Sequence, residues 1–321
     1  MLTPGKARGL QATATERGVF NILALDHRQN LRRLLSPDHP EAASFSEMRE
    51  FKRTVASEIG VSASAVLLDP EIGLAGTLGS AALSGHVGLI VALEETGFRG
   101  EPHDRRSNLL AGWSVEKARR IGASAVKLLV YYHPEAVGTS AQEQLVANVV
   151  ETCRAWDLPL FVEALSFSTI PGQKRVEVDR HLDTLVGIAA RLSRLGADVL
   201  KLEFPVHPDD DRGRDAWLEA CTALTSASQV PWLLLSAAVE FEQFSEQVSV
   251  ACGAGASGAM SGRAIWKEAV SVGPDERMSF LSTTARQRMV RLASIIDAAA
   301  RPWFVTLDPP GDQPEGWHRG Y

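Results

Sequence analysis

Seven charged or hydroxyl-bearing residues stand at or just after the carboxyl ends of short apolar stretches in this 321-residue chain. Because burial of an unpaired charge is costly, residues of this kind need a partner or a function. Any one of them could be a helix cap or half of a structural ion pair, but the whole set predicts a site. The set comprises Asp26, Asp69, Lys127, Glu163, Lys201, Ser236 and Arg263.

Two of these residues are lysines, and a glutamate lies on the stretch between them. Burial and a second nearby ammonium both lower the pKa of a lysine from its reference of ~10.4. A neutral amine is what Schiff-base chemistry requires, and a carboxylate beside it can move protons. Lys127, Glu163 and Lys201 therefore predict an imine-forming site. A buried structural Lys–Glu–Lys network is the alternative.

The elements that must position these residues are eight apolar stretches alternating with amphipathic, helix-like segments. Near-continuous apolar strands between helices are typical of a parallel sheet covered on its outer face. The strand ends at residues 26 and 261 lie seven repeats apart, a mean of about 34 residues per repeat, which fits a (β/α)₈ barrel. A doubly wound sheet is the alternative. The predicted strands are 19–26, 65–69, 87–93, 125–129, 160–164, 199–203, 232–236 and 257–261.

We expect residues 1–321 to form this single α/β TIM-barrel domain, with a last helix over 277–300 and an extended tail over 302–321. The carboxyl ends of barrel strands converge on one mouth, and alternate strands contribute to the same interior layer. Asp69, Lys127, Lys201 and Arg263 belong to strands two, four, six and eight. We therefore expect them to share that mouth, with Glu163 between the two lysines.

The last two repeats have the composition of a phosphate site. Small residues follow strand seven at 235–238, and Ser-Gly-Arg at 261–263 precedes a short predicted helix over 265–270. Small residues let backbone N–H groups approach an anion, and barrel phosphate sites often use these two loops. Ser236, Gly262 and Arg263 are the candidates, with a tight turn and an exposed arginine as the alternative.

Composition excludes several other classes of protein. The chain has 33 Lys and Arg against 39 Asp and Glu, a net charge of −6, and no basic block, so we expect no nucleic acid partner. Three scattered cysteines, no signal peptide and no apolar run near ~20 residues predict a soluble cytoplasmic protein that spans no membrane. The eight histidines lack ligand spacing, so we expect no metal. A GxGxxG match at 253–258 precedes a strand instead of following one, which argues against dinucleotide binding.

Motifs spread along nearly the whole chain resemble the class I tagatose 1,6-bisphosphate aldolases and the related sulfofructosephosphate aldolases. The EETGF, WSV (113–115) and closing ARPW segments are nearer to the tagatose-bisphosphate branch. The motifs are ALDHR (24–28), LLDPEIGL (67–74), EETGF (94–98), GWSVEKARRIGASAVKLLVYY (112–132), FVEAL (161–165), LKLEFP (200–205), LLLSAAV (233–239), SGRAIW (261–266) and ARPW (300–303).

The resemblance implies a TIM barrel in which Lys201 forms the Schiff base and Glu163 is the acid/base, with Asp26 and Lys127 as polar neighbours. It implies a ketose 1-phosphate held near Ser236, Gly262 and Arg263. The family usually has Asp-Gln-Arg after the first strand, whereas this chain has Asp26, His27 and Arg28. His27 would lie beside the substrate, and Arg28 is a further candidate for binding an anion.

The expected activity is class I cleavage of a ketose 1,6-bisphosphate, tagatose 1,6-bisphosphate foremost, to dihydroxyacetone phosphate and glyceraldehyde 3-phosphate, without a cofactor. The alternatives are cleavage of 6-deoxy-6-sulfofructose 1-phosphate to dihydroxyacetone phosphate and sulfolactaldehyde, and a non-catalytic sugar-phosphate-binding regulator. A small-molecule sugar phosphate is the expected partner, and we expect a homo-oligomer.

Overall fold

Eight parallel strands close into a barrel in chain order, so the predicted (β/α)₈ fold is confirmed. The computed structural model describes residues 2–208, 210, 213–319 and 321. Each strand pairs with the strands before and after it, and β8 closes against β1. The strands are β1 (Phe20–Leu25), β2 (Ala65–Leu68), β3 (Gly88–Ala92), β4 (Ala125–Tyr131), β5 (Leu160–Leu165), β6 (Val199–Leu202), β7 (Trp232–Leu235) and β8 (Gly258–Ser261).

The strands are apolar throughout because both of their faces are covered. In β4, Val126 and Leu128 pack outward against the helices, while Lys127 and Leu129 face the barrel interior. The amino-terminal half of the interior is filled by apolar side chains, among them Phe20 and Phe161, whose rings meet edge to face at 5.7 Å. Polar interior residues are therefore concentrated in the carboxyl-terminal half, which forms the floor of the site.

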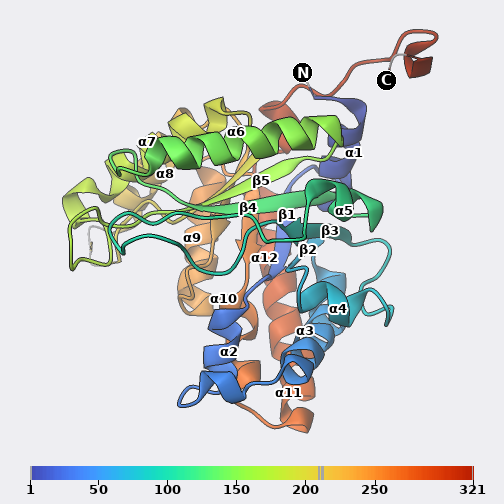
Figure 1. Ribbon diagram of the computed structural model, residues 1–321, viewed down its shortest axis with the longest axis vertical. Coiled ribbons are helices and arrows are strands. Elements are labelled where there is room, and N and C mark those ends of the chain that lie inside the picture. The colour runs from blue at the N-terminus through green and yellow to red at the C-terminus, as the bar shows by residue number, and fades with distance from the viewer. Residues whose placement is uncertain (1, 209, 211–212, 320) are drawn as a thin grey trace.

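Helices surround the barrel (Figure 1). Two differ from prediction: α10 begins at Arg263, two residues early, and the last predicted helix is α11 and α12 joined by a π-helical segment, Leu281–Ala285. The helices are α1 (Pro4–Thr13), α2 (Gln29–Leu35), α3 (Phe45–Ile59), α4 (Gly73–Thr77), α5 (Val115–Arg120), α6 (Thr139–Ala155), α7 (Val178–Arg194), α8 (Arg214–Ala227), α9 (Phe241–Gly253), α10 (Arg263–Trp266), α11 (Pro274–Phe280) and α12 (Arg286–Ala299).

Helix α1 and the segment after α12 lie together at the amino-terminal end of the barrel. The Lys6 ammonium of α1 pairs with buried Asp198 at 2.8 Å. Trp303 is buried in the same cluster as Leu10 of α1, and its backbone N–H donates to the Gly18 carbonyl at 2.9 Å. Figure 1 shows both chain ends here, where the Gly5 N–H donates to the Tyr321 hydroxyl at 2.8 Å.

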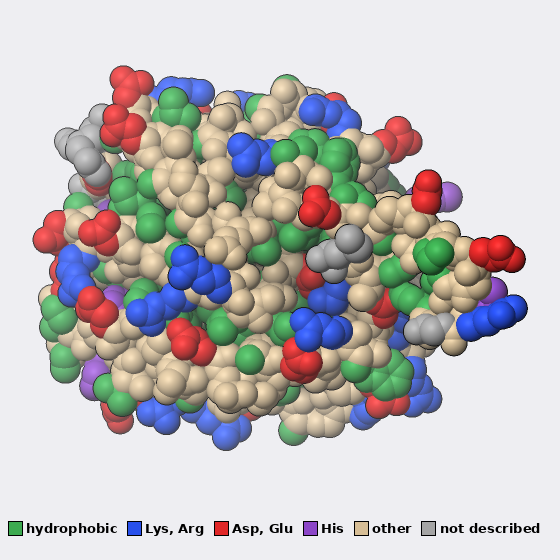
Figure 2. Space-filling view, turned by 90° about the horizontal axis from the view of Figure 1, so that it is seen from above, with side chains coloured by type: hydrophobic (Ala, Val, Ile, Leu, Met, Phe, Trp, Pro, Cys, Tyr) green, Lys and Arg blue, Asp and Glu red, His purple; other side chains and the backbone are tan. Residues whose placement is uncertain are grey.

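The outer surface is mixed in charge on the face seen in Figure 2, where Lys and Arg side chains alternate with Asp and Glu. No helix in the described part of the chain is long and apolar enough to cross a membrane.

Candidate active site

A cavity of about 620 Å³ opens at the carboxyl ends of the strands. Its walls come from every part of the chain, because the barrel brings the ends of all strands to one mouth. Nine of the ten residues that the sequence predicts for a site line it, and Asp69 does not. Residues up to 237 positions apart in sequence therefore surround one space. The nine are Asp26, His27, Arg28, Lys127, Glu163, Lys201, Ser236, Gly262 and Arg263.

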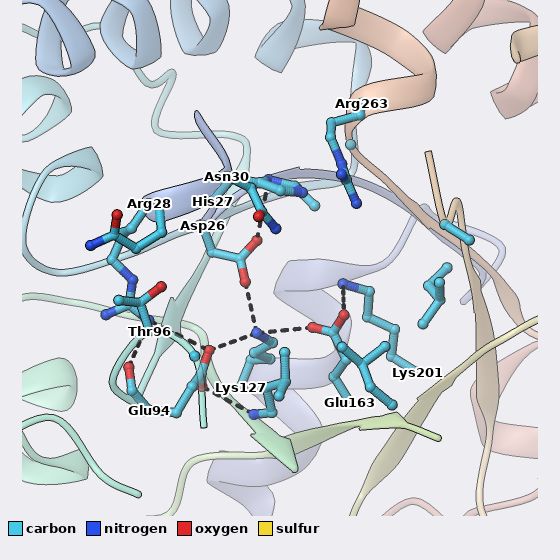
Figure 3. A pocket seen from close by; sticks show the side chains of 18 of the residues that line it. Asp26, His27, Arg28, Asn30, Glu94, Thr96, Lys127, Glu163, Lys201 and Arg263 are labelled. Carbon is cyan, nitrogen blue, oxygen red and sulfur yellow. Dashed lines mark hydrogen bonds and ion pairs between the residues drawn. The ribbon is translucent and has the colours of Figure 1, made fainter. Parts of the chain in front are cut away.

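Lys127 is the centre of the buried charge network at the cavity floor. Its Nζ lies 2.7 Å from Asp26 Oδ2, 2.7 Å from Glu94 Oε1 and 2.9 Å from Glu163 Oε2 (Figure 3). Burial lowers the pKa of Lys127, but the three carboxylates outweigh burial and hold that pKa well above its usual value. The expectation that crowding with Lys201 lowers the pKa of both lysines is therefore wrong for Lys127. Lys127 is thus held as a cation.

Lys201 has a different environment. Its Nζ lies 2.8 Å from Glu163 Oε1, and it has no second carboxylate partner among the described residues. The β5–β6 register places Glu163 directly beside Lys201, which explains the contact. Its side chain is 6% exposed and lines the cavity, so the amine is shielded from bulk water but faces the space where a ligand would lie. Of the two lysines, Lys201 is the one with room to bond a substrate.

Glu163 joins the two lysines through different oxygens. Burial raises its pKa, but Lys127 and Lys201 together hold the pKa below its usual value, so it is a carboxylate in the free protein. The Oε2 atom is buried and close to Lys127 Nζ, yet it makes no aligned hydrogen bond. That oxygen is therefore available to accept a proton.

Asp26 completes the ionised floor from the end of β1. Burial raises the pKa of Asp26, but Lys127, Lys201 and His27 outweigh burial and hold that pKa well below its usual value. Its Oδ2 accepts a hydrogen bond from Lys127. Among the described residues, no group of three or more His, Cys, Asp and Glu side chains is arranged to hold a metal ion.

The turns after β7 and β8 form one corner of the cavity. The Gly262 N–H donates to the Ser236 hydroxyl at 3.3 Å, which ties the two turns together. Ala237 and Ala238 have φ of 42° and 62°, a left-handed conformation that is strained for alanine and is found mainly at functional turns. The half-buried Arg263 side chain points into the cavity without a hydrogen bond or ion pair to any described residue (Figure 3). This corner can bind an anion.

His27 lies against this corner, packed edge to face on Trp266 at 5.2 Å. A Cβ on Gly262 would come within 2.8 Å of His27 Cε1, so the glycine makes room for the ring. Burial lowers the pKa of His27, and the charge of Asp26 opposes this. The positive charges of Arg263, Lys201 and Lys52 lower the pKa as well, and the result is a pKa of about 3. His27 is thus a neutral group on the same side of the cavity as Arg263.

Two residues are committed to structural contacts. The Arg28 guanidinium donates to Glu71 Oε2 and to the Glu94 carbonyl, both at 2.7 Å. Asp69 does not line the cavity, and the expectation that it shares the lysine layer is wrong. The chain leaves β2 at Leu68, so Asp69 turns away to pair with Lys52 and to accept the Ile72 N–H at 2.7 Å.

Glu94 is the main site residue that the sequence analysis missed. It is 3% exposed, and its Oε2 accepts the Leu129 N–H at 3.0 Å while Oε1 faces Lys127. Like the predicted residues, Glu94 is a charged residue just after an apolar strand. It lies two residues after Ala92 of β3, and residues two apart along a strand share a face. Thr96, Arg175 and Glu203 also line the cavity and were not among the predicted site residues.

Comparison with curated proteins finds relatives that match almost end to end. The chain is 30% identical over 324 residues to tagatose 1,6-diphosphate aldolase 2 of Streptococcus mutans, covering 94% of this chain and 98% of that protein. It is 30% identical over 319 residues to tagatose 1,6-diphosphate aldolase of Staphylococcus aureus, covering 93% and 97%.

Solved structures share the fold. One is a Schiff-base-forming fructose-1,6-bisphosphate aldolase, with a TM-score of 0.61 at 24% identity over 90% of this chain and 99% of that one. Another is fructose-bisphosphate aldolase of Plasmodium falciparum, with a TM-score of 0.70 at 12% identity over 94% and 97%. A family profile described as DeoC/LacD family aldolase matches residues 20–268. Since that match spans most of the chain and the relatives match it end to end, this chain belongs to the DeoC/LacD family of aldolases, which are carbon–carbon lyases.

Proposed function

We propose that this aldolase works through a Schiff base on Lys201 and cleaves a ketose 1-phosphate. The observation that carries the proposal is the contact chain Lys201–Glu163–Lys127, with ion-pair distances of 2.8 and 2.9 Å. It lies on the floor of a cavity that also holds Arg263, which has no ion pair with any residue that the structure describes. One lysine is held as a cation by three carboxylates, and the other shares a single carboxylate. This asymmetry separates a nucleophile from a fixed charge.

In the first half of the proposed reaction, Lys201 gives up a proton to Glu163, which passes it on to solvent and is again a carboxylate. The neutral amine attacks the C2 carbonyl carbon, the C=O π bond opens, and one amine proton moves to the oxygen to give a neutral carbinolamine. The carbinolamine hydroxyl then takes up a proton and leaves as water, and the nitrogen lone pair makes the C=N bond of an iminium ion. Lys127 remains protonated throughout and stabilises the anionic carboxylates around it. Fixed charges in a site of low polarity stabilise developing charge more strongly than water does.

In the second half, a carboxylate removes the proton of the C4 hydroxyl and the C3–C4 bond breaks. The bonding electron pair moves into the iminium to give an enamine, and the C4 fragment leaves as an aldehyde. Glu163 is the proposed base, since its Oε2 has no aligned hydrogen bond. The enamine is then protonated at C3, and water hydrolyses the resulting iminium to release the ketone and the free lysine.

The proposed 1-phosphate site is the corner formed by Ser236, Gly262 and Arg263. A guanidinium can meet phosphate oxygens through two parallel hydrogen bonds, which are stronger than neutral ones. The neutral His27 beside it adds a hydrogen-bonding group without a second charge. Binding energy from this remote group would hold the C2 carbonyl over Lys201 and would therefore appear in kcat as well as in KM.

Tagatose 1,6-bisphosphate is the proposed substrate, with dihydroxyacetone phosphate and glyceraldehyde 3-phosphate as products. The support is that both curated relatives carry the name tagatose 1,6-diphosphate aldolase and align over more than nine-tenths of their length. The cavity of about 620 Å³ lies within the range usual for small-molecule sites.

A retro-aldol assay on a substrate panel tests this proposal. The panel contains tagatose 1,6-bisphosphate, fructose 1,6-bisphosphate and 6-deoxy-6-sulfofructose 1-phosphate, each with and without a chelator. We expect the highest kcat/KM with tagatose 1,6-bisphosphate, unchanged by the chelator. Faster cleavage of the sulfonate would reassign the substrate, and activity that disappears with the chelator would refute the Schiff-base mechanism.

A further inference from the structure

Glu203 is a cavity carboxylate for which the mechanism above has no use. It follows β6 two residues after Lys201, and residues two apart along a strand lie on one face at a separation of roughly 6.6 Å. Both residues line the cavity. Because Lys201 pairs in register with Glu163, Glu203 lies one layer nearer to the mouth than the Lys201–Glu163 pair.

The contacts of Glu203 differ from those of the carboxylates at the cavity floor. Its Oε2 accepts the Ser166 N–H at 2.7 Å, which fixes the carboxyl group in place. No cation forms an ion pair with it among the described residues, whereas Asp26, Glu94 and Glu163 each contact Lys127. Glu203 is therefore anchored by neutral donors of Ser166 while it lines the cavity.

The charged and titratable groups around Glu203 come from several elements. Burial raises its pKa, the two hydrogen bonds from Ser166 lower it, and the charge of Glu163 raises it further, with a net rise. Arg175, from the loop after β5, lowers it slightly. Lys201 lies on its own strand, and a side pocket of about 160 Å³ that Glu203 also lines contains His181, His207 and Asp210.

The two carboxylates that flank Lys201 thus have opposite tendencies. Glu163 lies between two ammonium groups, which favour its ionised carboxylate form. Glu203 keeps its proton to higher pH. Environments that push apart the pKa values of two neighbouring carboxyl groups are the usual way in which a site separates an acid from a base.

We propose that Glu203 is the catalytic acid that protonates the departing hydroxyl of the carbinolamine on Lys201. This inference rests on the Schiff-base function proposed above. The Glu203 carboxyl gives its proton to the C2 hydroxyl, the C–O bond breaks to release water, and the nitrogen lone pair forms C=N. A neutral acid and a neutral carbinolamine become a carboxylate, an iminium ion and water. In the final hydrolysis the Glu203 carboxylate takes a proton from the attacking water, which restores the acid.

The test measures the rate of iminium formation directly. Enzyme is mixed with dihydroxyacetone phosphate, quenched with borohydride at successive times, and the reduced adduct is quantified by mass spectrometry across a pH series. The variants are Glu203→Gln, Glu203→Asp and, as the matched control, Glu95→Gln. Glu95 also lines the cavity but is paired with Arg99 at 2.8 Å. Circular dichroism and the final adduct level report whether each variant is folded.

We expect adduct formation by the wild-type protein to slow as pH rises through the pKa of Glu203. Glu203→Gln should form adduct ~10²–10⁴-fold more slowly, the usual contribution of general acid catalysis, and without that pH limb. Glu203→Asp should regain part of the rate and the limb, and Glu95→Gln should match the wild type.

Two outcomes would overturn the inference and leave the proposed function standing: adduct formation by Glu203→Gln at the wild-type rate, or an unchanged pH limb in that variant. A Glu203→Asp variant no faster than Glu203→Gln would also overturn it, since an acid would then bring no benefit. Absence of any adduct in the wild-type protein would refute the Schiff-base function and the inference together.

Discussion

Lys127 and Lys201 project from strands β4 and β6 into one cavity and contact the same glutamate, yet their surroundings assign them different chemistry. Three carboxylate oxygens within 2.9 Å fix a proton on Lys127. Within the described part of the chain, Lys201 has one such contact, and it faces the open cavity. At the scale of single residues, the number of carboxylates around each amine distinguishes the fixed cation from the proposed nucleophile.

Replacing Lys127 by methionine should destabilise the protein by about 3–5 kcal/mol at neutral pH, because it leaves buried carboxylates without their cation. The pKa values of Asp26 and Glu163 are held below their usual 3.8 and 4.5, so the stability they provide is present above about pH 4.5 and is lost as pH falls further. In Lys127→Met that depression is reduced, because Lys201 remains as the main neighbouring cation, and the difference from wild type should shrink below pH 4.5.

Urea unfolding at pH 7 and at pH 4 measures this difference. Lys174→Met, at an exposed lysine of the loop after β5, is the control and should unfold like the wild type at both values. A Lys127→Met penalty of equal size at the two pH values would show that packing, and not charge, is what Lys127 provides.

Glu163→Gln should lower kcat by ~10²–10⁴-fold, since the amide keeps the size and hydrogen bonding of the side chain but cannot accept a proton. Borohydride trapping on Lys201 should remain detectable, because the amine itself is intact. Steady-state cleavage rates and trapped adduct are measured on the same preparations. A near-normal kcat would remove Glu163 from the role of base and would direct attention to Asp26.

At the scale of elements, the turn from β8 into α10 brings the ring of His27 against the cavity corner formed by Ser236, Gly262 and Arg263. Gly262→Ala should lose about 1–3 kcal/mol of stability and also kcat/KM, because the new Cβ meets His27 Cε1 at 2.8 Å and overpacks the corner. Adding His27→Ala removes the obstructing ring, so the double variant should be more stable than additivity predicts. Urea unfolding of the two single variants and the double variant gives this coupling. Additive losses would mean that the glycine serves the backbone and not the ring.

The strands were predictable because a parallel barrel strand is buried on both faces and ends at a polar residue. All eight predicted strands overlap the observed ones, and the proposed site residues follow from where those strands end. The orientation of Asp69 could not be predicted, since it depends on Lys52 from α3 and on the start of α4. The commitment of Arg28 likewise depends on Glu71 and on the Glu94 carbonyl, which only the folded barrel brings within reach.

Glu94 was missed for a different reason. Its strand, β3, ends at Ala92, and the chain continues into a hairpin in which the Leu110 N–H donates to the Leu93 carbonyl at 2.8 Å. Glu94 therefore lies outside the regular strand, but its carboxylate reaches the interior layer that the strands form. Its place just after an apolar strand could be read from the sequence. Its contact with Lys127 could not, because only the closed barrel brings the two side chains together.

At the scale of the whole molecule, the barrel has a polar mouth and an apolar, closed opposite end. Helix α1 and Trp303 cover that end, and Trp303 is 2% exposed. Trp303→Ala should therefore cost about 3–5 kcal/mol, the usual loss for a buried tryptophan. Removal of residues 309–321 should cost about 1 kcal/mol or less, because the exposed contact between Gly5 and Tyr321 is a single hydrogen bond.

Urea unfolding of the two variants compares these losses. A truncation as damaging as Trp303→Ala would mean that the last residues stabilise the fold far more than their contacts indicate. Cleavage activity should be unaffected by the truncation, since the mouth of the barrel lies at the other end.

In the proposed reaction Lys201, and not Lys127, bonds the substrate. Borohydride reduction in the presence of dihydroxyacetone phosphate, followed by proteolysis and mass spectrometry of the peptides, tests it in one measurement. We expect the mass of the reduced substrate on the peptide that contains Lys201, and we expect Lys201→Ala to abolish both the adduct and turnover. An adduct on Lys127, or turnover without any adduct, would contradict this assignment.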